Sequence, residues 1–148
     1  MLQWKQVWRN GISPALTTKE LVILQKGLIS DDPKLIQGKT INIFVEHESE
    51  APVRVIGACA LAYCGWIGSN LETMTDVLQT FNDTCTRIAI HLKTTIGFIP
   101  FVKWFDNTPR EQMRQELLEE VNIELERRGS SEKDTRENGS KVCYAGKL

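Results

Sequence analysis

Residues 53–63 have the sequence VRVIGACALAY, in which Arg54 is the only charged side chain. Pro52 precedes them at a position that the first turn of a helix tolerates, and Gly65 follows shortly after them. Apolar residues would surround such a helix on nearly every side, so the sequence predicts a helix at the centre of the fold. Its alanines are small enough to let neighbouring backbones approach closely. We therefore expect the other elements to pack around residues 53–63.

The segment before this predicted helix has the pattern of a strand. Ile41, Ile43 and Val45 recur at every second position of residues 40–45, which is the spacing of one face of a strand. A single strand leaves its edges unsatisfied and needs a partner. The partner strand could come from the segment before residue 17 or from another chain. If residues 40–45 are not a strand, no partner strand is needed.

Two sequence signals predict where long helices begin. Thr17 and Glu20 have the spacing of a capping box, which predicts a helix from residue 18 to about residue 29. Thr73 and Asp76 open a second long helix in a similar way. The buried stripe of this second helix is predicted to consist of Leu78, Phe81, Cys85, Ile88 and Leu92.

A third signal opens the last predicted helix. Thr108 suits an N-cap, Pro109 a first helical position and Glu111 the third position. Apolar residues then recur every four positions from Met113, and Gly129 is a typical end. After this glycine, polar residues dominate, and such a segment buries too little apolar surface to offset its ordering entropy.

The predicted fold class follows from these elements. We expect a mostly α protein, a compact bundle of five or six helices with one short strand or hairpin and a disordered C-terminal tail. The helical domain is predicted to span residues 1–128, and the polar tail residues 129–148.

Composition excludes several classes of protein. The chain has 148 residues, 41% of them hydrophobic and 25% charged, with a formal net charge of −1, which is typical of one ordinary folded domain. With no excess of basic residues, we expect neither a nucleic-acid partner nor a membrane partner. The sequence has no secretory signal pattern, and its four cysteines do not form a spaced disulfide framework. These features predict a cytoplasmic protein with reduced thiols.

Catalytic signatures are absent from the sequence. No GxGxxG motif after a strand, no phosphate-binding loop motif and no HExxH motif occurs, and the cysteine and histidine spacings do not suit a zinc site. Cys64, His47 and either Glu46 or Glu48 are the only set near enough in sequence to suggest a nucleophile, a base and an orienting acid. We predict no catalytic residue, no metal and no cofactor. The sequence leaves open whether the chain is an enzyme, and the missing motifs favour a protein that is not one.

Aromatic residues are the remaining candidates for a functional role. Trp66 lies in a glycine-flanked segment that predicts a turn, and Trp104 and Phe105 belong to an aromatic group after Pro100. Such side chains are enriched in protein interfaces, although a core role is the simpler interpretation. We expect a small non-catalytic protein that binds another protein or itself, as an accessory or regulatory subunit or as a homo-oligomer. The alternative is a helical enzyme or small-ligand binder that uses a Cys/His/carboxylate pocket.

Overall fold

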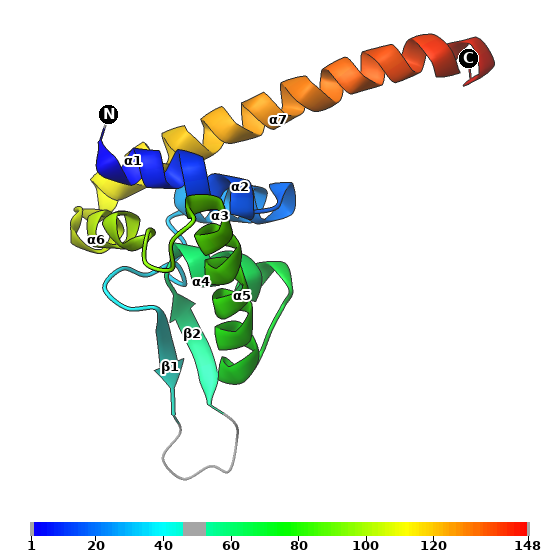
Figure 1. The fold of residues 1–148 in the computed structure, drawn as a ribbon. Coiled ribbons are helices and arrows are strands. Elements are labelled where there is room, and N and C mark those ends of the chain that lie inside the picture. The colour runs from blue at the N-terminus through cyan, green and yellow to red at the C-terminus, as the bar shows by residue number, and fades with distance from the viewer. Residues whose placement is uncertain (1, 46–52, 148) are drawn as a thin grey trace.

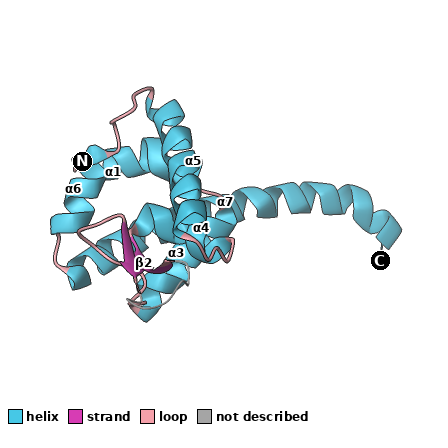
Figure 2. Ribbon diagram, turned by 90° about the horizontal axis from the view of Figure 1, so that it is seen from below, coloured by secondary structure: helices cyan, strands magenta, loops and turns pink. Residues whose placement is uncertain are grey.

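The computed structural model describes residues 2–45 and 53–147, with side-chain surroundings up to residue 129. Its elements, in chain order, are α1 (Gln3–Val7), η1 (Trp8–Ile12), α2 (Ser13–Ala15), α3 (Thr18–Ser30), β1 (Ile41–Phe44), β2 (Arg54–Ala58), α4 (Ala60–Gly68), α5 (Met74–Leu92), α6 (Ile99–Asn107) and α7 (Arg110–Lys147). The chain is mostly helical and carries one antiparallel pair of strands, as the sequence predicted. The two strands project from one side of the helical body and the end of α7 projects from another (Figures 1 and 2).

The single central helix expected over residues 53–63 is wrong in its first half. Residues 54–58 form β2, and Cys59 is the N-cap of α4 with an extended backbone. The β-branched residues Val55 and Ile56 fit a strand better than a helix, and pairing with β1 satisfies their backbone. The second half keeps the expected position, because α4 is buried from Ala60 to Trp66 and packs against both α3 and α5.

The predicted strand finds its partner within the same chain. In the antiparallel register Ile41 pairs with Ala58 and Phe44 pairs with Arg54, with a bulge between these two pairs. The two-stranded sheet leaves the outer edge of β1 without a strand neighbour among the described residues. Helix α5 runs alongside β2, and β1 lies on the side of β2 away from α5 (Figure 1).

Two of the predicted helix starts are confirmed. Glu20 donates its backbone N–H to the Thr17 hydroxyl at 3.1 Å, and the Glu20 carboxylate accepts from the Thr17 amide at 3.0 Å, which completes the capping box of α3. At α5 the Thr73 hydroxyl accepts from the Asp76 amide at 3.1 Å. Each bond satisfies an N–H group that a helix start would otherwise leave unpaired.

Two details of the helices differ from the prediction. Thr108 donates its hydroxyl to the Trp104 carbonyl and so closes the end of α6 instead of capping the start of α7. In α5 the buried positions are Val77, Thr84 and Ile88, whereas Leu78 is exposed, so the buried stripe is rotated from the predicted one. The sequence pattern missed this because a buried threonine can bond to its own helix, as Thr84 does to the Thr80 carbonyl.

The core has an aliphatic part and an aromatic part. Leucines of α3 lie in the same buried cluster as α4 and as Met113, Leu117 and Val121 of α7. The aromatic part joins the N-terminal helices to α6, with Trp8 and Phe101 ring centroids 5.8 Å apart. These contacts pack α1 against α6, which lies far from it in the sequence.

The helical backbone of α7 continues past Gly129, where the sequence predicted an end. A Cβ atom added at Gly129 would meet nothing within 4 Å, so this position of the helix faces open space. The side chains of the predicted tail, residues 130–148, lie outside the described part of the structure, and disorder of this tail stays a prediction.

Candidate functional site

A groove beside β2 is the first candidate site. We call it the Trp66 groove, and its volume is about 580 Å³. It is lined by Lys34, Val53, Arg54, Val55, Ile56, Trp66, Leu71, Glu72 and Thr73. Five of these nine side chains are apolar, and the volume falls within the range typical of ligand-binding clefts. The groove therefore combines an apolar wall with a few polar groups.

Backbone bridges hold the Trp66 groove open at both ends of β2. At one end Arg54 forms an antiparallel bridge with Thr73, just before α5 begins. At the other end Ala58 donates its amide to the Lys34 carbonyl at 2.8 Å. Both contacts connect a loop to the same strand. Backbone hydrogen bonds therefore fix the two ends of the groove, in addition to its side chains.

The exposed end of the two strands is the second candidate site. We call it the hairpin end, and it consists of Ile43, Phe44, Val45 and Ile56. Their exposed fractions are 38%, 52%, 53% and 42%, respectively. Ile43 and Phe44 are neighbours on a strand and so point to opposite faces, which means that neither face is covered here. Ile56 belongs to both the hairpin end and the Trp66 groove, so the two surfaces are contiguous.

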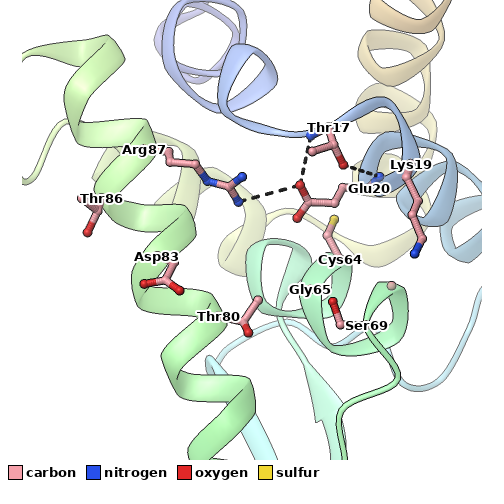
Figure 3. Close-up of a pocket in the computed structure, with 11 residues that line it drawn as sticks. Thr17, Lys19, Glu20, Cys64, Gly65, Ser69, Thr80, Asp83, Thr86 and Arg87 are labelled. Atoms are coloured by element: carbon pink, nitrogen blue, oxygen red, sulfur yellow. Dashed lines mark hydrogen bonds and ion pairs between the residues drawn. The ribbon is translucent and has the colours of Figure 1, made fainter.

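A polar pocket of about 480 Å³ lies between α3, α4 and α5 (Figure 3). Arg87 of α5 points across it toward Glu20 of α3, with 3.7 Å between Arg87 Nη2 and Glu20 Oε1. Lys19 and Asp83 also line the pocket, so its two cations face two acids. Glu20 is already used in the cap of α3. The pocket thus has no excess charge to select an ion.

Cys64 lines this polar pocket but lacks the properties of a nucleophile. Its Sγ donates to the Ala60 carbonyl at 3.2 Å, and the side chain is fully buried. Burial raises the pKa of Cys64 far above its usual value, so the thiol stays protonated at neutral pH. His47, Glu46 and Glu48, the other members of the predicted catalytic set, lie outside the described residues.

A small apolar cavity of about 90 Å³ lies beside Cys59. Its lining includes Phe81, Phe98 and Phe101. Burial raises the pKa of the Cys59 thiol, against the opposing effect of the backbone groups of Leu61 and Ala62 at the start of α4. This thiol is therefore also held in the neutral form.

The three residues predicted to bind a partner lie in different surroundings. Trp66 is not on a turn: it lies in α4, is only 7% exposed and forms part of the wall of the Trp66 groove. Trp104 is half-buried and stacks on Trp4 with 3.6 Å between ring centroids. Phe105 is buried in the core. Of the three, Trp66 lines the Trp66 groove, and a partner-binding role stays a prediction for each of them.

Several residues of the candidate sites gave no signal in the sequence. Lys34, Arg54 and Trp66 line one groove, although 32 positions separate the first from the last. Glu120 lies in a charged stretch of the sequence, yet it is 2% exposed, and Arg9 donates to its two carboxylate oxygens at 2.7 and 2.9 Å. No local spacing rule brings together residues from distant elements, so these groupings depend on the tertiary fold.

The described residues show neither a metal-binding cluster nor a membrane-spanning helix. Within the described residues, no group of three or more His, Cys, Asp or Glu side chains is arranged to hold a metal ion. No helix in the described part of the chain is both long and apolar enough to cross a membrane. Comparisons with models of protein families, with curated proteins and with solved structures found no match.

Proposed function

We propose that this chain is a non-catalytic cytoplasmic protein that binds another protein through the hairpin end, as an accessory or regulatory subunit. The observation that supports the proposal is the clustering of four substantially exposed apolar side chains beside the edge of β1 that no described strand pairs with. Natural proteins usually blunt such an edge with charged residues, proline or a covering element. β1 itself, with the sequence INIF, contains no charged residue and no proline.

The geometry favours an extended segment of the partner as the occupant. An extended chain that adds to a free sheet edge gains main-chain hydrogen bonds, and its side chains pack on those of the edge strand. Ile43 and Phe44 offer apolar contacts on the two faces of β1. A second copy of this chain, which would make the protein a homo-oligomer, is one outcome of the test below.

The test compares two apolar-to-polar variants at exposed positions of different elements. Phe44→Ser removes an apolar contact at the hairpin end, and Ile90→Ser changes a 69% exposed residue on α5 as the control. The partner is captured with the tagged chain, purified and mixed with each variant, and hydrogen exchange of the β1 amides is measured. We expect Phe44→Ser to weaken binding by about tenfold or more, as at an interface anchor, and Ile90→Ser to leave it unchanged.

Hydrogen exchange identifies the surface that the partner covers. The proposal requires slower exchange at β1 in the complex. Protection of α5 in place of β1, or equal weakening by both variants, would contradict it. Sedimentation of the chain alone at several concentrations shows whether the partner is a second copy.

A further inference from the structure

We propose that the Trp66 groove binds an acidic peptide segment, whose carboxylate lies between Lys34 and Arg54 and whose apolar side chain packs against Trp66. This inference rests on the proposed protein-binding function and adds the chemistry of the partner. It concerns a surface next to the hairpin end, and its evidence is independent of the exposed apolar side chains there.

Arg54 differs from the other described arginines. Six of them have a carboxylate oxygen within 3.7 Å of the guanidinium group, and these are Arg9, Arg87, Arg110, Arg114, Arg127 and Arg128. Arg54 is exposed at the mouth of the groove and forms no ion pair with a described residue. A guanidinium group presents several N–H donors in a planar fork that matches a carboxylate. The guanidinium group of Arg54 is therefore available to bind a carboxylate of a ligand.

Lys34 supplies a second cation to the same groove. Its backbone is fixed on both sides, since its amide donates to Asp32 Oδ1 at 3.0 Å and its carbonyl accepts from Ala58 at 2.8 Å. Its Nζ lies 6.0 Å from the centroid of the Trp66 ring, which places the ammonium group over the aromatic wall. No described carboxylate forms an ion pair with it. The ammonium group is thus held at the groove and not neutralised there.

The charge balance of the groove favours an acidic ligand. Among the described lining residues, Lys34 and Arg54 face one acid, Glu72, so this described part of the lining carries a net positive charge. A basic segment would meet two like charges, whereas an acidic segment would meet two opposite charges. Complementary charges of this kind contribute more to the choice of partner than to the absolute affinity.

The apolar lining of the groove suits an apolar side chain next to the carboxylate of the peptide. Trp66, Val55 and Leu71 line the groove beside the two cations. A volume of about 580 Å³ holds a few side chains and not a folded domain. A short segment in which Asp or Glu neighbours Leu or Phe combines the charge and the apolar surface that this groove offers.

The experiment uses the full chain and three capped peptides of one length: GELEFG, GQLQFG and GKLKFG. Binding is followed by NMR titration, with the Trp66 indole N–H and the amides of β2 as reporters. We expect affinity to fall in the order acidic, neutral, basic. Arg54→Gln and Lys34→Gln should each weaken binding of the acidic peptide by about twofold to fivefold, as exposed ion pairs of up to about 1 kcal/mol imply, and leave binding of the neutral peptide unchanged.

Two further variants control the experiment. Lys19→Gln removes an exposed cation that lines the polar pocket and should not change any affinity. Arg54→Lys keeps the charge without the fork, so it should weaken binding of the acidic peptide less than Arg54→Gln does. Equal binding of the three peptides, no binding of any, or an equal loss in Lys19→Gln would overturn the inference.

The outcomes also separate this inference from the proposed function. If Phe44→Ser abolishes partner capture but no peptide binds, the groove proposal fails and the hairpin proposal stands. If the acidic peptide binds selectively while Phe44→Ser captures the partner normally, the groove proposal stands and the role of the hairpin end fails. Serine is uncharged, so this variant does not alter the field at Arg54, which pairs with Phe44.

Discussion

Burial controls the chemistry of the three described thiols. Cys59, Cys64 and Cys85 are unpaired with one another, and burial raises the pKa of each above its usual value. At Cys85 the pKa is raised to about 11. A thiol is a poor nucleophile in its protonated form, so none of the three has the lowered pKa that is typical of a catalytic cysteine.

This arrangement predicts slow thiol chemistry in the folded chain. With a raised pKa the reactive thiolate appears only as the pH rises, so the reaction of Cys85 with a disulfide reagent should quicken about tenfold per pH unit from pH 7 until the pH approaches about 11. The rate is measured in Cys143→Ser, which removes the thiol of the predicted tail. The same reaction in denaturant, where burial is lost, is the control. A fast thiol near pH 7 in the folded chain would favour the enzyme alternative.

Glu120 shows a limit of inference from single residues. Glu119 and Glu120 are adjacent and look alike in the sequence, yet Glu120 alone is among the buried residues. Its burial is possible because Arg9, 111 positions away, donates to both carboxylate oxygens. A buried carboxylate without such a partner would be strongly unfavourable. The distinction between the two glutamates therefore arises from a contact that no local pattern contains.

At the scale of elements, the crossing of α4 and α5 depends on a glycine. A Cβ atom at Gly65 would lie 2.2 Å from Thr80 Cγ2, which is closer than nonbonded carbons approach. Gly65 therefore lets the two helices come together, in line with the expected role of small residues in this region. A glycine within a helix costs up to about 1 kcal/mol relative to alanine, and the close packing offsets that cost.

We predict that Gly65→Ala destabilises the protein by about 1 to 3 kcal/mol through this clash. Thr80→Ser removes the Cγ2 atom, and the double variant should recover most of the loss. Gly129→Ala, in a helix with open space around it, is the matched control and should be neutral or slightly stabilising. Denaturant unfolding measures all four chains. Equal effects of Gly65→Ala and Gly129→Ala would rule out the clash.

Element boundaries were predictable where the signal is local. The capping residues Thr17 and Thr73 were identified from the sequence because each bonds an amide three positions away. The division between β2 and α4 at Cys59 was not, because a run of apolar residues suits a buried strand and a buried helix equally. The pairing of Ile41 with Ala58 resolves that ambiguity, and it exists only in the folded chain. The Trp66 groove was missed for the same reason, since β2 forms one of its walls.

At the scale of the whole molecule, the two parts of α7 lie in different surroundings. Its first part packs against α3, and Arg114 donates to the carbonyls of Leu28 and Ile29 at 2.9 and 3.1 Å. Arg128 makes the last such links, with 2.9 Å bonds to the carbonyls of Ser13 and Leu16. Beyond these bonds the ribbon of α7 extends away from the other helices (Figure 2).

This contrast predicts a boundary of proteolytic stability near Gly129. An isolated helical segment without packing is marginal in water, and the glycine, serine and asparagine residues of 129–140 lower its helix propensity further. Trypsin under native conditions should therefore cut first after Lys133, Arg136 and Lys141. It should spare Arg114, whose guanidinium group bonds to the end of α3. The mass of the resistant fragment, followed over time, measures the boundary, and its unchanged unfolding transition shows that the fragment is the folded domain. A tail that resists trypsin as long as Arg114 does would mean that residues 130–148 pack against a surface of their own.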